Sequence, residues 1–175
     1  MYTESKFDYM SNWIGMINII TLNNCNMFWW IMPSFLNKLV KKIADKKAVN
    51  ALIPILAEED DSARFYAALA LGKIGSTEAV EPLARSLKDK NYSVKYMAAK
   101  ALANIGGKAT VDVFIKTLKD GDETMRETAA NYLGDLGDIS AVSALVAGQF
   151  DNNKFVKEAS TKSLKKLVYH KIKKI

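Results

Sequence analysis

The 175-residue sequence contains one cysteine, Cys25, and one histidine, His170. A single cysteine excludes an intramolecular disulfide framework and any zinc site that needs several thiolates, and it fits a reducing, cytoplasmic compartment. A single histidine removes the metal sites that need two or three imidazoles, and no Ser/His/Asp or Cys/His set can be built around it. The glycines lie at helix ends rather than in a phosphate-binding loop. We therefore expect no catalytic residues, no metal and no cofactor.

Proline and glycine are also scarce, with 3 and 9 residues. This scarcity disfavours an all-β fold, which needs many turns. Apolar residues make up 49% and charged residues 25% of the chain, as in an ordinary globular protein, and the length suffices for one domain with a sizeable core.

A tandem repeat occupies most of the sequence. Segments that begin at Arg64, Lys95 and Arg126 align at a constant offset, and a degenerate fourth copy begins at Lys157. The clearest columns of equivalent residues are Ala67, Ala98 and Ala129; Leu71, Leu102, Leu133 and Leu164; Gly75, Gly106 and Gly137; and Asp89, Asp120 and Asp151. Self-similarity at a period of about 31 residues is the signature of a repeat architecture.

Each unit has the pattern of two helices. In one unit the first helix carries a single apolar stripe, formed by Val94, Ala98, Leu102 and Ile105. Gly106 then stands where a left-handed C′ residue ends a helix, and the second helix carries Val111, Phe114 and Leu118. Residues suited to turns and helix N-caps open successive units, namely Asp60, Asn91, Asp122 and Asn153. Alanines in the first helices allow close helix packing.

One helix pair cannot bury both of its apolar faces alone, whereas stacking buries them. We therefore predict an all-α fold, a right-handed α-solenoid of stacked antiparallel helix pairs. Its repeat domain spans 33–175, with an N-terminal capping repeat at 33–60, full repeats at 61–91, 92–122 and 123–153, and a C-terminal capping helix at 154–175. A polar outer face on that last helix suits a terminal repeat.

The segments AALALGKIGSTEAVEPLARSLKD and AAKALANIGGKATVDVFIKTLKD resemble the short HEAT-like repeats first described in phycobilin lyases. The resemblance covers about residues 35–170. It implies a reusable scaffold rather than one activity. It also implies that the inter-repeat aspartates, Asp89, Asp120 and Asp151, link neighbouring units through Arg64, Lys95, Arg126 and Lys157. Deoxyhypusine hydroxylase resembles this fold too, but it depends on repeated His-Glu motifs, which the sequence lacks.

Residues 1–32 form an apolar extension outside the repeat, without a charged residue from Tyr9 to Asn37. Three interpretations stay open. Residues 13–32 could anchor the chain in a membrane, since about 20 apolar residues span a bilayer, although four asparagines interrupt them. The extension could instead fold back as a cap over the first repeat, or it could lie upstream of a natural start at Met27 or Met32. A secretory signal is disfavoured, because no basic n-region precedes the apolar stretch.

Charge is unevenly distributed along the chain. Residues 48–153 carry 11 basic and 15 acidic groups, whereas residues 152–175 carry 8 lysines and one acid, Glu158. An acidic body disfavours wrapping around nucleic acid. The basic end, which comprises Lys162, Lys165, Lys166, Lys173 and Lys174, could still contact phosphates or an anionic surface.

The second helices should line the concave face of the solenoid, the usual binding surface. Their outward positions form a charged ridge, which comprises Glu81, Arg85, Lys88, Asp112, Lys116 and Lys119. Glu81 with Arg85, and Asp112 with Lys116, are spaced as acid and base at i and i+4. Two interpretations stay open: the charges satisfy one another within each helix, or they form a mixed-charge recognition strip.

These features predict a non-enzymatic protein–protein interaction scaffold, monomeric and cytoplasmic, with membrane anchoring as the alternative location. Two alternative functions are retained. The repeat resemblance implies a phycobilin-lyase-like protein that attaches a tetrapyrrole, and the lysine-rich last helix suggests binding to nucleic acid or to an anionic surface. The partner itself cannot be predicted from the sequence.

Overall fold

The structure, a computed structural model, describes the backbone of residues 45–172 and the side chains through residue 169. Every regular element in this range is helical. A helical segment at 45–55 comes first. It is followed by α3 (Asp61–Ile74), η1 (Thr77–Ala79), α4 (Val80–Ser86), α5 (Tyr92–Ile105), α6 (Gly107–Asp120), α7 (Glu123–Leu136), η2 (Ile139–Ala141), α8 (Val142–Gly148) and α9 (Lys154–Ile172).

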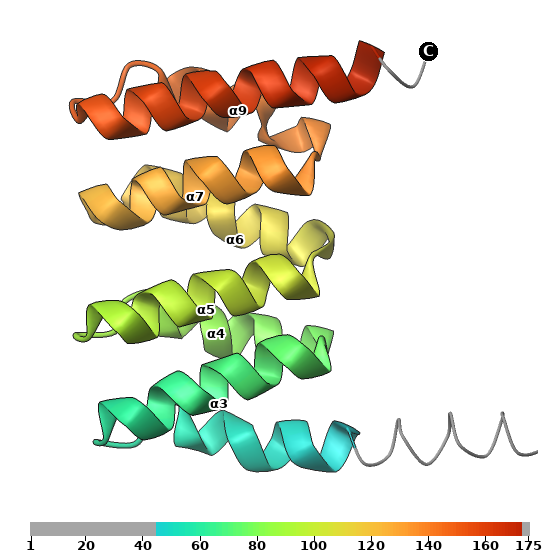
Figure 1. Cartoon of the computed structure of the whole chain (residues 1–175), viewed down its shortest axis with the longest axis vertical. Coiled ribbons are helices and arrows are strands. Elements are labelled where there is room, and N and C mark those ends of the chain that lie inside the picture. The colour runs from blue at the N-terminus through green and yellow to red at the C-terminus, as the bar shows by residue number, and fades with distance from the viewer. Residues whose placement is uncertain (1–44, 173–175) are drawn as a thin grey trace, which may run out of the picture. The chain divides into compact units, whose positions relative to one another are not determined.

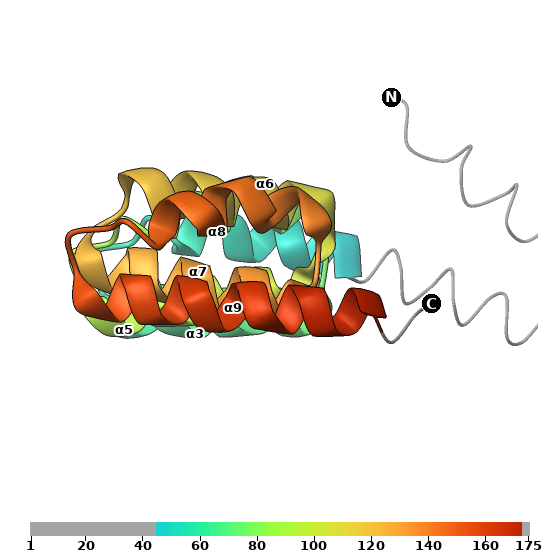
Figure 2. The same cartoon turned by 90° about the horizontal axis from the view of Figure 1, so that it is seen from above.

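The described helices form two layers. The first helices of the units, α3, α5, α7 and α9, lie one above another in Figure 1. Seen from above, α6 and α8 lie behind them in a second layer (Figure 2). Contacts run between adjacent units, from α3 to α5 and from α7 to α9. The all-α solenoid of stacked helix pairs predicted from the sequence is therefore confirmed.

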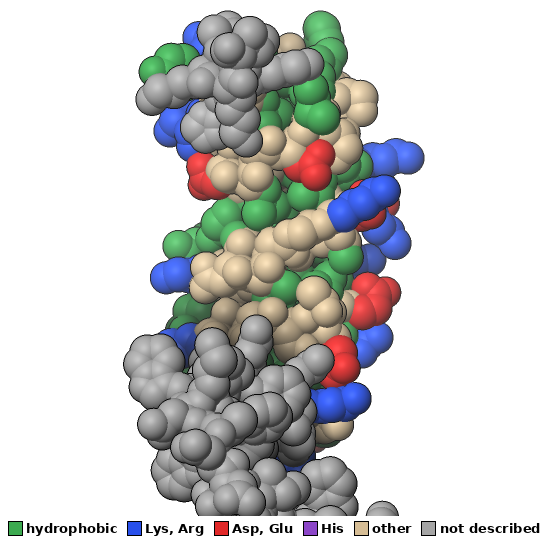
Figure 3. Space-filling model, turned by 90° about the vertical axis from the view of Figure 1, so that its right-hand side faces the viewer, with side chains coloured by type: hydrophobic (Ala, Val, Ile, Leu, Met, Phe, Trp, Pro, Cys, Tyr) green, Lys and Arg blue, Asp and Glu red, His purple; other side chains and the backbone are tan. Residues whose placement is uncertain are grey.

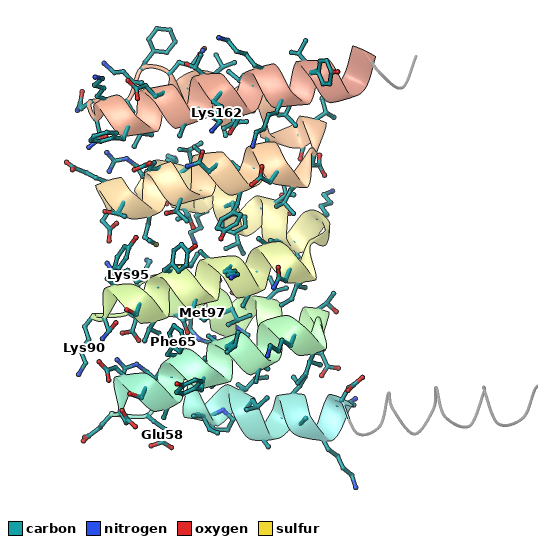
Figure 4. All side chains as sticks on the ribbon, viewed as in Figure 1. Glu58, Phe65, Lys90, Lys95, Met97 and Lys162 are labelled. Atoms are coloured by element: carbon teal, nitrogen blue, oxygen red, sulfur yellow. The ribbon has the colours of Figure 1, made fainter. Side chains whose placement is uncertain are left out.

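The repeated apolar columns form the core. Leu71, Leu102 and Leu133 are fully buried, and so is Phe114 on α6. Phe65 on α3 and Met97 on α5 lie in the space between these two helices (Figure 4). The predicted stripe of α5 is buried at Val94, Ala98 and Leu102, and Ile105 is half-buried.

Small residues allow the first helices to approach closely. A Cβ added to Gly134 would collide with the Ser163 side chain, and one added to Gly72 would lie 2.7 Å from the Ala101 backbone. Alanines of the first helices pack in the same layer, and Ala68, Ala98 and Ala129 are fully buried. Any larger side chain at these glycines would separate two units.

The four expected N-caps are confirmed. Asp60 accepts a hydrogen bond from the Ser62 N–H, and Asp122 accepts one from the Met125 N–H. Asn91 caps α5 in the same way, and Asn153 accepts from the backbone at the start of α9. Each cap satisfies backbone donors that a helix start leaves without partners.

The middle unit departs from its neighbours at its glycine. Gly75 and Gly137 end their helices in the left-handed conformation, whereas Gly106 has φ 66° and ψ −160°. The prediction of a left-handed C′ residue is thus wrong at Gly106, although its positive φ still favours glycine. The residue that follows explains the difference. Ser76 and Asp138 each hold a short turn with a side-chain hydrogen bond, but Gly107 has no side chain, and α6 starts there directly.

The structure tests the predictions for the N-terminal end only in part. At the N-terminal end, the capping-repeat prediction is described only from residue 45, where Val49 is fully buried. The predicted extension at 1–32, with its anchor, cap and upstream-start interpretations, lies outside the described residues. Between residues 45 and 172, no helix is both long and apolar enough to cross a bilayer.

Candidate partner-binding surface

A ladder of ion pairs joins the start of each full unit to the turn at its end. The Arg64 guanidinium donates two hydrogen bonds to the Asp89 carboxylate, at 2.7 and 2.9 Å, and two more to the carbonyls of Glu58 and Glu59. Arg126 binds Asp151 in the same bidentate way, at 2.8 and 2.9 Å. These charges are buried or nearly so. The expected link between these arginines and aspartates is therefore present in two units.

The middle unit differs from the expected ladder. Lys95 pairs with Asp122 instead of Asp120. Asp89 follows the end of α4 and accepts the Asn91 N–H, whereas Asp120 is still the last residue of α6. Lys157, expected to continue the ladder, forms no ion pair among the described residues.

Ladder aspartates are held in the charged form. Burial opposes ionisation of Asp89, but hydrogen bonds from Arg64 and from the Asn91 N–H outweigh it, so the pKa of Asp89 lies below its usual value. The hydrogen bond from Arg126 lowers the pKa of Asp151, and the one from Lys95 lowers that of Asp122. The three ion pairs, Arg64 with Asp89, Lys95 with Asp122 and Arg126 with Asp151, thus occupy these charges with one another.

The charged ridge behaves in the opposite way. All six of its residues are exposed. Glu81 forms no ion pair with Arg85, and Asp112 forms none with Lys116, within the part of the chain that the structure describes. Charge satisfaction inside each helix, one of the two open interpretations, is therefore not observed. Basic and acidic side chains alternate down the right edge of Figure 3, on the side of the second helices.

A pocket opens beside the ridge, between the helical segment 45–55 and α4. Its volume is about 260 Å³. The residues that line it are Ile53, Leu56, Ala57, Pro82, Arg85, Ser86, Lys88 and Asp89. Ile53, Leu56, Ala57 and Pro82 give the pocket its apolar lining, and Arg85 and Lys88 add two basic side chains. The sequence analysis did not predict this pocket, because it forms between two units.

The ridge ends in apolar side chains on the last pair. Phe150 occupies the position equivalent to Lys88 and Lys119, yet it is 80% exposed. Val146, one turn earlier, is 43% exposed. The repeat alignment carried a signal for this change, since a large apolar residue replaces lysine at a solvent-facing position.

At the basic end, a shallow groove runs along α9. Its volume is about 330 Å³, and it is lined by Lys157, Glu158, Thr161, Lys162 and Lys165. Lys162 lies on α9 (Figure 4). In the unit at 61–91, the positions equivalent to Thr161 and Lys165 are Ala68 and Gly72, which pack on the next unit.

The other basic-end lysines are placed differently. Lys166 is drawn into an ion pair with Asp135 of α7, at 2.6 Å. Lys173 and Lys174 lie outside the described residues. Across the described residues, no cluster of three or more His, Cys, Asp or Glu side chains could hold a metal ion.

Comparisons with known proteins agree with this architecture. A family model described as HEAT repeats matches residues 36–94 and 85–165. Human deoxyhypusine hydroxylase, solved in complex with glycerol, has a TM-score of 0.69 at 20% identity, over 74% of this chain and 46% of that one. The chain therefore spans less than half of the hydroxylase. An identity this low shows the fold alone.

Two further solved structures are more distant. An engineered protein gives a TM-score of 0.47 at 23% identity, over 75% of this chain and 67% of that one. The complex of CpcE and CpcF of phycocyanin lyase from Nostoc sp. PCC7120 gives 0.46 at 21% identity, over 71% and 66%. No curated protein matches the sequence.

Proposed function

The chain belongs to the HEAT repeat family, and from that premise we propose that it is a non-enzymatic scaffold that binds a protein partner through its charged ridge. The observation that carries the proposal is the contrast between occupied and free charges. Ladder charges are paired in every full unit, whereas the ridge presents exposed charges without partners on one side of the stack, among the residues that the structure describes. Exposed polar groups arranged on a rigid repeat suit recognition by another macromolecule.

Regular spacing supports the proposal. Glu81 and Asp112 are one repeat apart, as are Arg85 and Lys116, so each pair recurs on adjacent second helices. Those helices lie roughly 10 Å apart in a packed stack. A partner that follows the stack would therefore meet the same pattern of charges on each second helix.

Photo-crosslinking in native lysate tests the proposal with the full chain. A photo-reactive residue at position 116 should capture one protein partner, and the same residue at Lys100, on the first-helix layer, should not. With the photo-reactive residue kept at position 116, the combined variant E81Q/R85Q/D112N should lose this adduct. Its matched control, K73Q/E58Q/E59Q, removes two acids and one base elsewhere and should keep it. Equal capture at positions 116 and 100 would refute the ridge as the binding surface.

A second candidate function rests on the groove of α9, where Lys157, Lys162 and Lys165 are exposed. These lysines suit an anionic polymer or surface. If they bind a DNA duplex, affinity should fall steeply with salt, and replacing all three by alanine should reduce the log–log salt slope by roughly one for each lost contact. Anionic vesicles in a parallel assay would separate a membrane surface from nucleic acid.

The enzymatic alternatives receive less support. The deoxyhypusine hydroxylase likeness is one of fold, and the single histidine of this chain cannot supply repeated His-Glu motifs. The tetrapyrrole-attachment alternative rests on the repeat resemblance. Incubation of the chain with a bilin and an acceptor protein would decide it, by the presence or absence of a covalent coloured product.

We further propose that the chain is monomeric and cytoplasmic, with a membrane anchor at 13–32 as the alternative. Sedimentation of the purified chain tests the first point, and fractionation of native cells tests the second. The N-terminal mass of the natural protein is equally informative. A start at Met27 or Met32 would remove most or all of the apolar extension, together with the anchor and cap interpretations.

A further inference from the structure

Resting on the proposed scaffold function, we propose that the pocket between the helical segment 45–55 and α4 binds an extended acidic segment of the partner protein. An apolar side chain of that segment enters the pocket, and its carboxylates pair with Arg85 and Lys88. The acidic run then continues across the stack to Lys116 and Lys119.

The charged side chains at the pocket that have no ion-pair partner among the described residues are both basic. Three charged residues line it, namely Arg85, Lys88 and Asp89. The Asp89 carboxylate is already occupied by the Arg64 guanidinium and by the Asn91 N–H. Arg85 and Lys88 are exposed and form no ion pair with any described residue, so the pocket offers two cations and no free anion.

The pocket wall is apolar. Ile53 and Leu56 are half-buried against the core, and Pro82 comes from α4. The Ser86 hydroxyl is directed to the Pro82 carbonyl, at 3.4 Å, and so does not present a free donor. A volume of about 260 Å³ suits one aliphatic or aromatic side chain rather than a whole cofactor.

The same cation pattern recurs on the next second helix. Lys116 and Lys119 stand one repeat after Arg85 and Lys88, in the last turns of α6. Adjacent helices lie roughly 10 Å apart, which an extended chain covers in about three residues. Acidic residues spaced by about three positions would therefore meet both pairs of cations in turn.

Acidic ridge residues give the segment a defined track. Glu81 and Asp112 lie one turn nearer the starts of their helices than Arg85 and Lys116, so a negative segment is repelled from that side. At the far ends of these two helices, Asp89 is already paired with Arg64, and Asp120 is an exposed acid that forms no ion pair with a described residue. Beyond α6 the equivalent positions are Ala147 and Phe150, and Phe150 is 80% exposed. An apolar residue at the second end of the segment would find a contact there.

Selection from a random peptide display library on the immobilised full chain tests this inference. We expect enriched peptides to carry two or more Asp or Glu residues next to Leu, Ile, Met or Phe. Enriched peptides resynthesised with a fluorescent label should bind R85Q/K88Q at least about tenfold more weakly, because both charge partners are lost. Ala57→Phe should also weaken binding, since it fills the pocket from an exposed position and leaves the core intact.

Matched controls keep the test decisive. K73Q/K100Q removes two exposed cations from the first-helix layer and should leave peptide affinity unchanged. Thermal melts of every variant identify any that fail to fold. Three outcomes overturn the acidic-segment inference. The first is normal peptide affinity in Ala57→Phe, and the second is enrichment of basic peptides. The third is enriched peptides that bind R85Q/K88Q as well as the natural protein.

Failure here is separable from failure of the scaffold function. If selection yields only basic peptides whose binding depends on Glu81 and Asp112, the inference is overturned while crosslinking at position 116 still supports a ridge partner. Binding of a single-stranded oligonucleotide that requires Arg85 and Lys88, with no enriched acidic peptide, overturns the peptide occupant in favour of nucleic acid. Absence of crosslinking at position 116 overturns the scaffold function itself.

Discussion

Two sets of charged residues follow the same stack of helices, and they differ in what their charges contact. The ladder residues Arg64 and Arg126 are turned inwards, and their guanidinium groups join carboxylates and carbonyls of neighbouring turns. The ridge residues point into solvent and pair with nothing in the described chain. Similar residue types at similar spacing thus hold units together in one place and leave charge available in the other.

The position of the hydrogen-bond acceptors around a basic side chain, rather than the residue type, therefore decides whether its charge is paired or exposed. A guanidinium beside a turn can reach a carboxylate and several carbonyls at once. An acid and a base at i and i+4 on an exposed helix gain only about 0.3–0.5 kcal/mol by pairing, so water competes successfully. Four experiments would break or sharpen this contrast.

Acidification should give the largest effect, because it acts on the ladder of all three units. Asp89, Asp122 and Asp151 have folded-state pKa values below 3.8. Their stabilisation is therefore complete above that value and is lost as the pH falls through the lowered pKa values. Denaturant unfolding from pH 6 to pH 2 should show this loss. The triple variant D89N/D122N/D151N should start less stable and lose less on acidification, whereas E81Q/D112N should follow the natural protein.

Removing a single ion pair of the ladder should lower the free energy of unfolding by less than acidification does. We expect Asp151→Ala to lower the free energy of unfolding by about 2–3 kcal/mol, because it leaves the Arg126 guanidinium and the Asn153 N–H without their acceptor. A double-mutant cycle with Arg126→Ala should give a coupling energy of about 1–2 kcal/mol. The same cycle on Glu81 and Arg85 should give a value near zero. Equal couplings in both cycles would abolish the distinction between ladder and ridge.

Changing only the shape of the cation should have a smaller effect. Arg126→Lys keeps the charge but loses the bidentate fork, so we expect a loss of about 1 kcal/mol. Chemical denaturation measures it. The reciprocal change, Lys95→Arg, should restore no bidentate rung to Asp120, because that residue ends α6 instead of lying in the following turn. A gain as large as the loss at Arg126 would contradict this explanation.

Neutralising the ridge should have the smallest effect on stability. E81Q/R85Q/D112N/K116Q removes exposed charges that have no partner in the described chain, so the free energy of unfolding should change by no more than about 0.5 kcal/mol. Thermal and denaturant unfolding check this expectation. A large loss of stability would show that these charges support the stack, and any loss of binding in that variant would then need a different explanation.

The repeat made much of the fold predictable from the sequence. Its constant period aligned Leu71, Leu102 and Leu133, and all three are fully buried. N-caps such as Asp60 and Asn91 were predictable for a local reason, since an Asx side chain satisfies the free N–H groups of the helix that follows it. Gly106 was less predictable, because its ψ depends on whether the next residue can hold a turn.

The site was predictable only in part. Sequence spacing identified the outward positions of the second helices, including Arg85 and Lys116, but it could not decide between internal pairing and exposure. The pocket beside Arg85 has walls from two successive units. Its existence depends on how far two helices separate, which no single-unit pattern encodes.

By itself, the sequence determined the helical class, the repeat length and the buried columns, because apolar periodicity and capping act within one or two turns of chain. Only the tertiary structure decided which charges are occupied. Whether Lys95 reaches Asp120 or Asp122, and whether Asp89 is free to meet a partner, depends on distances set by the packing of neighbouring units.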